Sequence, residues 1–462
     1  MPKPARNDWQ ELTGRGIPFA WCLGMIVLRR SWLSRRRFNL AWGQWRRQAL
    51  FVLGGIAVGA IAVALAFAAD QAGAAFRRIE AVDARIALVL TPAGFAACRW
   101  LTRRYVPNAG GSGIPQAIAA RRLYGLVARH RLVSLQTAFG KIGLLLLGLL
   151  CGASIGREGP TVQVGASIMF ALGRVSPRRQ PGLILAGAAA GVAAAFNTPL
   201  AGIVFGIEEM SRSFEARTSG VVLGTVIAAG LTSMALQGDY TYFGTTQVVL
   251  HGLQGWLAVP VLGVVGGLLG GGFSRALILV AGGLPGAFGR QVKRWPVLFA
   301  MACGLLVAGC GLLSNGATFG TGYDQARGLL DGGSSGMSFG LLKLVATLAS
   351  AVSGIPGGIF APSLAVGAGL GANLATLLPG APVQALVVLG MARYFAGVVQ
   401  APITAFVIVS EMTGDHAMVV PLMLTALIGY ATSRLVCAEG VYHALARNFV
   451  AAALPSAATP PH

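Results

Sequence analysis

The chain has 462 residues, of which 55% are hydrophobic and only 11% are charged, and its formal net charge is +21. Because soluble domains carry about 25% charged residues, this composition excludes an ordinary soluble protein and predicts an integral membrane protein. The six cysteines are scattered through apolar runs and the five histidines lack metal-ligand spacing. No Walker motif, dinucleotide loop or nucleophile elbow occurs. We therefore expect buried structural thiols, no metal and no cofactor.

Residues 1–48 form a basic segment before the first long apolar run. Ten of the 36 basic residues lie there, and positive charge before a first span holds that end of the chain in the cytoplasm. A nucleic-acid-binding arm is the weaker alternative. Residues 16–28 are apolar but too short to span, and no small-residue cleavage site follows, so an interfacial helix is expected rather than a signal peptide. The chain is thus predicted to be a multi-pass protein of the cell (inner) membrane with no nucleic-acid partner.

Five apolar runs are near or above the roughly 18–20 residues that a span requires. Other apolar stretches are shorter and are cut by Gly or Pro, and the 66 glycines allow close helix packing. The polar stretch Gln237–Gln254 separates a first membrane repeat, 49–240, from a second, 250–450, which a short tail, 451–462, follows. The long apolar runs lie at 49–69, 132–155, 217–237, 295–314 and 417–433.

The segment Asn108–Gln116 reads as a Gly-rich loop that opens a helix. Gly111 and Gly113 let the backbone approach a ligand, Pro115 suits the first turn of a helix, and the Ser112 hydroxyl is a free donor. A tight turn without a ligand is the alternative.

A charged pair interrupts an apolar run at Gly156-Arg157-Glu158-Gly159-Pro160. A carboxylate at such depth is costly, which makes it a functional candidate. Gly and Pro break the helix here, and free N–H groups at a helix start bind anions. Glu158 is therefore either a buried structural acid or a mobile carboxylate that competes with an anion for one place.

The second half repeats this design at Gly357-Gly358-Ile359-Phe360-Ala361-Pro362. Neither Ile359 nor Phe360 has a side chain that binds anions, so their backbone amides would be the donors. A simple helix kink is the alternative.

Two acids, Glu208 and Glu209, end the apolar run that begins at Pro199. They suit proton access from a water-facing helix end, or else an ordinary acid pair balanced by Arg212. Tyr442 follows the last long apolar run, where an interfacial tyrosine is the ordinary interpretation.

Two blocks recur in step along the chain. Gly156–Ile168 aligns with Gly358–Leu370 at an offset of 202 residues, and Pro199–Glu208 aligns with Pro402–Glu411 at an offset of 203. Repeats with broken helices at matching positions indicate a substrate site at the repeat interface, near the midplane. The halves are inverted if each crosses the membrane an odd number of times, a number that the sequence alone does not settle.

These motifs resemble the CLC family of chloride channels and chloride/proton exchangers. All three signature segments, 111–115, 156–160 and 357–362, stand in the family's order, and the helix start at 196–202 and the ending Glu208-Glu209-Met210 also match. The resemblance covers about residues 45–450. It implies an all-α integral membrane protein with a CLC-type fold of two inverted-topology repeats, containing broken and re-entrant helices, and a homodimer in the lipid bilayer. Because the chain ends soon after Tyr442, C-terminal regulatory CBS domains are not expected.

The resemblance implies an anion site with hydroxyl donors at Ser112 and Tyr442, where serine at the first position goes with chloride and proline with nitrate. The backbone at Gly113 belongs to the same loop, and the amides of Ile359 and Phe360 complete the site. The supporting motif residues are Gly111, Pro115, Gly156, Arg157, Gly159, Pro160, Gly357, Gly358 and Pro362.

The resemblance also implies that Glu158 is the gating glutamate and Glu209 the internal proton glutamate, with Glu208 beside it. An acid at position 209 resembles an exchanger, whereas a channel has an apolar residue there. Gln116, with Ala117 and Ile118 after it, stands where well-known bacterial exchangers carry acids, which puts the usual water and proton route there in doubt.

The sequence thus predicts a secondary active antiporter that exchanges chloride for protons, not an enzyme. Three alternatives remain open: a passive voltage- or pH-gated chloride channel, an exchanger of nitrate or fluoride, and an intramembrane hydrolase that would pair Glu158 with a histidine. The last lacks a histidine in any of the motif segments.

Overall fold

The structure is a computed structural model, whose described backbone comprises residues 19–173, 179–211, 216–238, 241–246, 248–250, 252–377 and 381–453. Side chains are described from residue 48 onward, apart from further gaps at 216–219 and 253–254. The chain divides into two compact units, residues 1–51 and 52–462, and the larger unit carries the features below.

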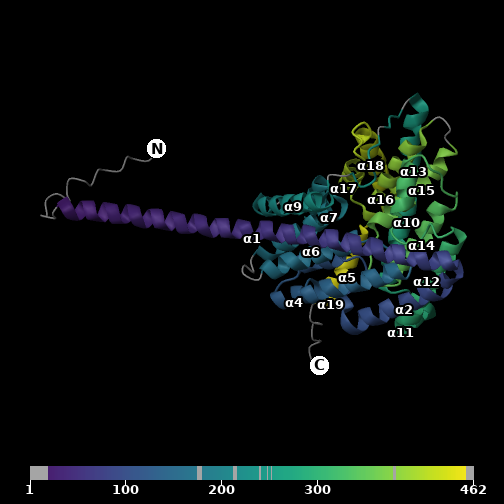
Figure 1. Ribbon diagram of the computed structural model, residues 1–462, viewed down its shortest axis with the longest axis horizontal. Helices are drawn as coiled ribbons and strands as arrows, with labels where there is room; N and C mark the ends of the chain where they lie inside the picture. The colour runs from purple at the N-terminus through teal and green to yellow at the C-terminus, as the bar shows by residue number, and fades with distance from the viewer. Residues whose placement is uncertain are drawn as a thin grey trace, which may run out of the picture. The chain divides into compact units, whose positions relative to one another are not determined.

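The described elements are all helices (Figure 1). In chain order the α-helices are α1 (Phe19–Val82), α2 (Ala87–Tyr105), α3 (Ile114–Arg122), α4 (Leu126–Leu132), α5 (Leu135–Leu150), α6 (Glu158–Leu172), α7 (Gln180–Phe196), α8 (Pro199–Phe205), α9 (Ala216–Gln237), α10 (Gly252–Gly282), α11 (Gly286–Arg294), α12 (Pro296–Leu313), α13 (Tyr323–Leu330), α14 (Phe339–Val352), α15 (Phe360–Ala375), α16 (Val383–Val399), α17 (Pro402–Thr413), α18 (Val419–Val436) and α19 (Val441–Ala453). Short 3-10 helices occur at η1 (Ala84–Ile86) and η2 (Pro107–Ala109), and a π-helix, η5 (Gly206–Ser211), continues α8.

Seven helical stretches within the described ranges are long and apolar enough to cross a membrane. Five of them overlap the apolar runs that the sequence predicted. The other two, Ala84–Tyr105 and Gly255–Gly282, were not predicted, because arginines stand near both ends of the first and Pro260 and many glycines interrupt the second. Both stretches are helical although their local composition does not favour a long apolar helix, because neighbouring helices pack against them.

The remaining apolar helices are too short to span a bilayer alone, and they meet in broken pairs. In each repeat a 17-residue helix, α7 or α16, ends at a residue in the left-handed region: Asn197 (φ 56°) or Gln400 (φ 60°). A new helix then begins at Pro199 or Pro402, where the ring suits the first turn. The breaks place helix ends inside the protein, which is where ions bind in such folds.

The two repeats cap each other's broken helices. The carboxylate of Glu208 accepts hydrogen bonds from the backbone N–H of Ile403 (3.1 Å) and Thr404 (2.6 Å) at the start of α17. Reciprocally, the carboxylate of Glu411 accepts from Leu200 (3.1 Å) and Ala201 (2.8 Å) at the start of α8. A carboxylate at a helix N-terminus satisfies free N–H groups and complements the helix dipole.

The same two-fold relation appears in the backbone at the centre. Gly156 and Gly358 form an antiparallel bridge in which each N–H donates to the other's carbonyl oxygen, at 2.8 and 2.7 Å. A reciprocal bridge between equivalent residues marks an internal two-fold axis. The predicted repeat is therefore present, and the fold is that of two inverted-topology repeats.

Buried lysines also occupy equivalent places in the repeats. Lys141 Nζ donates to the carbonyl oxygens of Ala109 (2.8 Å) and Gly111 (2.6 Å), which precede α3. Lys343 Nζ donates to Thr318 (2.9 Å) and Gly320 (2.8 Å), which precede α13. Each lysine thus anchors a Gly-rich loop through two of its carbonyl oxygens.

Candidate ion-binding site

The predicted motif segments converge at the repeat interface. The loop before α3 reaches it through Gly111 (φ 69°) and Gly113 (φ 103°), conformations that glycine adopts without strain. A Cβ built on Gly159, at the start of α6, would lie 2.4 Å from Ser112 Oγ and 3.2 Å from the Gly358 Cα. Three chain segments distant in sequence therefore approach so closely that only glycine fits between them.

The supporting residues of the motifs lie in this same centre. Pro115 stands in the first turn of α3, as predicted, and Pro160 and Pro362 stand in the first turns of α6 and α15. A Cβ on Gly357 would lie 2.5 Å from the Ile155 side chain. These residues shape the backbone and carry no ligand chemistry of their own.

Glu158 is completely buried (0% exposed) and begins α6. Its Oε2 accepts a hydrogen bond from the backbone N–H of Ala361 (3.4 Å) at the N-terminus of α15, and the carboxylate packs over Gly156. Its Oε1 has no hydrogen-bond partner within the described part of the chain. The carboxylate therefore lies where the free N–H groups of a helix start would hold an anion.

Two buried hydroxyl groups face this centre from other elements. Tyr442, on α19, is 0% exposed, so the interpretation as an interfacial tyrosine is wrong. Its side chain lies beside Ser112 and within electrostatic range of Glu158. Neither the Ser112 Oγ nor the Tyr442 Oη has a hydrogen-bond partner among the described residues. Unsatisfied buried donors are costly, and an anion between them would accept from both.

Ile359 and Phe360 are buried at the start of α15. Because neither side chain is polar, only their backbone N–H groups could bind an anion there. The Phe360 ring packs against an aromatic cluster: its centroid lies 4.7 Å from that of Phe395 and 5.8 Å from that of Tyr442. Phe196 and Phe205 complete the cluster. These rings keep water away from the site and fix the N-terminus of α15.

Arg157 does not pair with its neighbour Glu158 but reaches outward. Its Nη1 donates to the Ala66 carbonyl oxygen (2.8 Å) and to Asp70 Oδ1 (2.7 Å) on α1. The side chain of Asp70 is 68% exposed. No local sequence pattern indicates this pair, because 87 residues separate its members.

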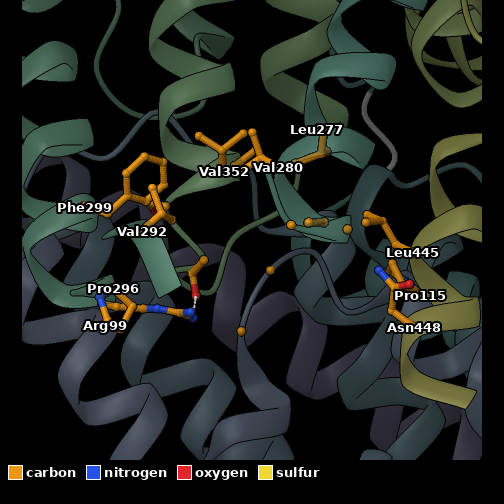
Figure 2. A pocket seen from close by; sticks show the side chains of 18 of the residues that line it. Arg99, Pro115, Leu277, Val280, Val292, Pro296, Phe299, Val352, Leu445 and Asn448 are labelled. Atoms are coloured by element: carbon orange, nitrogen blue, oxygen red, sulfur yellow. Dashed lines mark hydrogen bonds between the residues drawn. The ribbon is translucent and has the colours of Figure 1, made fainter. Parts of the chain in front are cut away.

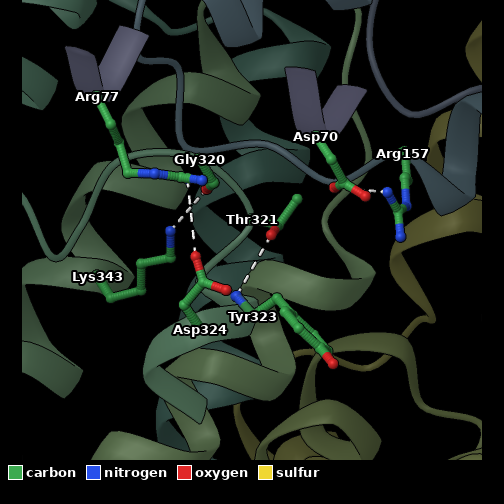
Figure 3. A network of polar contacts seen from close by, with 8 residues as sticks. All are labelled: Asp70, Arg77, Arg157, Gly320, Thr321, Tyr323, Asp324 and Lys343. Atoms are coloured by element: carbon green, nitrogen blue, oxygen red, sulfur yellow. Dashed lines mark hydrogen bonds and ion pairs between the residues drawn. The ribbon is translucent and has the colours of Figure 1, made fainter. Parts of the chain in front are cut away.

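A cavity of about 310 Å³, here named the Arg157 cavity, adjoins this pair. Figure 3 shows two ion pairs around it, Asp70 with Arg157 and Arg77 with Asp324, together with the Lys343 anchor of Gly320. The cavity is lined by Ala69, Asp70, Gly73, Arg77, Leu149, Arg157, Gln237, Tyr242, Gly320, Thr321, Tyr323 and Asp324.

A second cavity, of about 710 Å³ and here named the Ser112 cavity, is lined by Ser112 and by residues of α10, α11 and α19. Figure 2 shows Leu277 and Val280 on one side and Leu445 and Asn448 on another, with Arg99 donating to the Gly354 carbonyl oxygen (3.0 Å). The two cavities share no lining residue. Glu158 follows Arg157, which lines one cavity, and the helix that it begins approaches Ser112, which lines the other, through Gly159.

Gln116, at a position where the resemblance led us to consider acids, is fully buried. Its Nε2 donates to the carbonyl oxygens of Asn108 (3.2 Å) and Gly110 (2.6 Å). The amide therefore braces the loop that presents Ser112 and has no proton to exchange.

The two acids predicted at the end of the helix that begins at Pro199, Glu208 and Glu209, lie in different surroundings. Both residues lie in the π-helix η5, an irregularity often found at functional sites. Glu208 caps α17 and also accepts from the Thr404 hydroxyl (2.7 Å). Glu209 is 3% exposed, and its Oε1 lies 3.5 Å from the Nε2 of His443. His443, next to Tyr442 on α19, was not singled out from the sequence.

Comparisons with known proteins agree with this geometry. Residues 93–434 match the family model described as voltage gated chloride channel. The chain is 33% identical over 380 residues to a ClcB-like protein of Ralstonia nicotianae, covering 76% of this chain and 86% of that protein. It is 34% identical over 357 residues to the H(+)/Cl(−) exchange transporter ClcA of Cronobacter sakazakii, covering 71% and 72%.

Among solved structures, a slow cyanobacterial Cl−/H+ antiporter matches with a TM-score of 0.74 at 24% sequence identity, over 88% of this chain and 98% of that one. This likeness concerns the fold, which is therefore of the CLC type. Together with the matched family model, the observations show that the chain belongs to the voltage gated chloride channel family.

Proposed function

We propose that this protein is a secondary active antiporter that exchanges chloride for protons across a membrane. The observation that carries the proposal is the position of the fully buried Glu158 carboxylate at the N-terminus of α15, where it accepts from the Ala361 N–H. An acid that occupies an anion site can couple the two ions, because its ionised carboxylate and a bound anion exclude one another there, whereas protonation frees the site for the anion. The ClcA relative, named an H(+)/Cl(−) exchange transporter, supports the assignment.

The anion pathway follows from the donors. Chloride from the Ser112 cavity meets the hydroxyls of Ser112 and Tyr442 and the backbone amides at Ile359 and Phe360, which replace its water shell. Ionised Glu158 holds the next position and blocks passage toward the Arg157 cavity. When Glu158 takes up a proton, its attraction to the helix N-terminus weakens, the side chain leaves, and chloride passes.

The proton pathway uses a second carboxylate. Glu209 is almost completely buried, and we assign it the exchange of protons with Glu158. A passive channel needs no acid at this place. Glu208 is committed to the N-terminus of α17, so our proposal gives the proton role to Glu209 and a structural role to Glu208.

The arrangement in the membrane belongs to the same proposal. We propose that the N-terminus lies in the cytoplasm of a cell whose inner membrane holds the protein, and the basic residues before position 49 support this orientation. A homodimer with one pathway in each subunit is proposed from the family resemblance.

The proposal is tested by reconstituting the protein and its Glu158→Gln variant in liposomes under a chloride gradient. Glu158→Gln removes the titrating acid but keeps its shape, so we expect chloride flux to persist and proton movement to vanish. Proton movement against chloride in this variant would contradict the scheme. Glu209→Gln, with Glu411→Gln as a matched control at the other repeat, separates the mechanisms: an exchanger loses proton movement in the first variant only, whereas a channel shows none in any.

A further inference from the structure

Glu209 is almost completely buried in the described structure. Its side chain is 3% exposed, yet the proposed exchange requires that its proton equilibrate with solution in each cycle. Another group must therefore carry the proton over the intervening distance. Gln116, in the loop where acids were considered, is a buried amide and cannot serve.

His443 connects the buried acid with an exposed residue. Its Nε2 lies 2.9 Å from the Glu209 backbone oxygen and 3.5 Å from the Glu209 Oε1. Its Nδ1 lies 2.6 Å from the Nη2 of Arg122, which ends α3 and is exposed. The imidazole side chain itself is only 8% exposed.

The partners fix the state of the imidazole. A guanidinium only donates, so the Nδ1 of His443 accepts from Arg122, and the proton of the neutral ring resides on Nε2. That Nε2–H donates to the Glu209 backbone oxygen and lies within a small side-chain rotation of the carboxylate. One ring nitrogen therefore faces the acid and the other faces the exposed end of α3.

We propose that His443 relays protons between water at the exposed end of α3 and the carboxylate of Glu209. The inference rests on the proposed chloride/proton exchange and names a further proton-transfer residue for it. Histidine suits the role because it changes charge between about pH 5 and 8, closer to neutrality than any other ordinary side chain.

Each transfer is balanced. Hydronium beside Arg122 gives a proton to Nδ1 as the guanidinium moves aside, which forms imidazolium and water. The imidazolium then gives the Nε2 proton to the ionised Glu209, which leaves a neutral acid and an imidazole protonated on Nδ1. Water-assisted tautomerisation then restores the starting ring: one water molecule takes the Nδ1 proton and another returns a proton to Nε2, while Glu209 keeps the proton that it received. The reverse sequence carries a proton outward.

Among the described residues, the charged groups seen in contact with His443 include Glu209 from η5 and Arg122 from α3. Within the described structure, the other charged groups of the helices packed around α19 bond elsewhere. Arg121 donates to the Met210 oxygen and the Ser211 hydroxyl, Glu208 accepts from the start of α17, Arg275 donates to the Val436 oxygen, Arg393 donates to the Leu262 oxygen, and Arg447 pairs with Glu439.

A purely structural role would use His443 only to tie α19 to η5. His443→Gln separates the two roles, since its amide N–H can still donate to the Glu209 backbone oxygen but cannot take up a proton. His416→Gln makes the same change at an exposed loop position and is the matched control. His443→Asn and His443→Ala supply further variants if the glutamine variant does not fold.

The experiment records chloride and pH together in liposomes across pH 5 to 8. We expect His443→Gln to lower the coupled exchange rate by at least about tenfold, because a positioned acid–base group contributes roughly 100-fold or more. The wild-type rate should follow a titration that this variant lacks, and added imidazole should restore part of the rate of His443→Ala. His416→Gln should match the wild type.

The Glu158→Gln background gives the discriminating readout, because chloride then moves without protons. If His443 is a relay, the double variant Glu158→Gln/His443→Gln should have a chloride flux less than twofold below that of Glu158→Gln alone. An equal loss of chloride flux in this background, or wild-type exchange with a wild-type pH profile in His443→Gln, would overturn the relay while leaving the exchange intact. Absence of proton movement in the wild-type protein would overturn the exchange itself, and the relay with it.

Discussion

At the scale of single residues, the site is built from donors that the protein leaves unsatisfied. The hydroxyls of Ser112 and Tyr442 are buried without hydrogen-bond partners in the described structure, and the Glu158 carboxylate lies on a helix N-terminus. The unpartnered hydroxyls cost stability unless an anion accepts from them, whereas a carboxylate at a helix N-terminus is itself stabilised by the helix dipole. The geometry therefore favours alternation between chloride and a carboxylate at one place.

Removing the Ser112 hydroxyl should weaken chloride binding. A hydrogen bond to a charged group contributes about 1.5–3 kcal/mol, so Ser112→Ala should raise the Kd for chloride by roughly 10- to 100-fold, as measured by isothermal titration calorimetry. Ser167→Ala, a buried position further along α6 whose hydroxyl bonds only to the Gln163 oxygen, should leave the Kd unchanged. Equal affinities in the two variants would exclude Ser112 from the site.

Gly159 should accept no side chain. A Cβ there would lie 2.4 Å from Ser112 Oγ and 2.9 Å from the Ser112 carbonyl oxygen, so Gly159→Ala should displace the Ser112 loop and lower chloride flux at least about tenfold. In Gly143→Ala, on α5, the new methyl group meets no atom within 4 Å, and because Ala favours helices over Gly by about 1 kcal/mol, flux should persist. Normal chloride flux from Gly159→Ala would show that this contact does not limit transport.

At the scale of the elements, the broken helices α8 and α17 depend on each other. Glu208 and Glu411 each hold two backbone N–H groups of the opposite repeat. This explains why two matching sequence blocks end in an acid: the acid of one block completes the helix start of the other. The sequence pattern alone led us to group Glu208 with Glu209, because adjacency in sequence does not reveal which way each side chain points in a π-helix.

Loss of either cap should destabilise the protein by a similar amount. A helix cap contributes about 0.5–2 kcal/mol, so Glu208→Ala and Glu411→Ala should each lower the thermal midpoint in detergent, and the effects should be comparable. Asp331→Ala, an exposed acid that pairs with Arg327 one turn away at 3.8 Å, should change the midpoint little, because exposed pairs contribute little. A midpoint unaffected by Glu411→Ala would refute reciprocal capping.

At the scale of the whole molecule, the sequence was enough to predict the two repeats, the motif segments and the position of the buried acid Glu158. Each of these depends on Gly, Pro and charged residues at fixed spacing. Other features could not. The partner of Arg157 is Asp70 on α1, and the partner of Glu209 is His443, 234 residues away. Such pairs arise only from tertiary packing, and a lone histidine after a tyrosine carries no local pattern.

The cavities show the same division between local pattern and packing. The Ser112 cavity draws its walls from α10, α11 and α19, helices whose sequences carry no motif. The proposed route runs from the Ser112 cavity past Ser112 and Glu158 to the Arg157 cavity. These groups come together only when the two repeats pack against each other. That order is the physical basis for exchange: a single buried acid stands between the two routes.

The most direct test of this account records external chloride and pH together as liposomes containing the purified protein dissipate a chloride gradient. We expect protons to move opposite to chloride, and to move against their own gradient when the chloride gradient is larger than the proton gradient. In the Glu158→Gln variant this proton movement should be abolished. Chloride flux with no proton movement in the wild-type protein would contradict it, and would make Glu209 an acid without a role in transport.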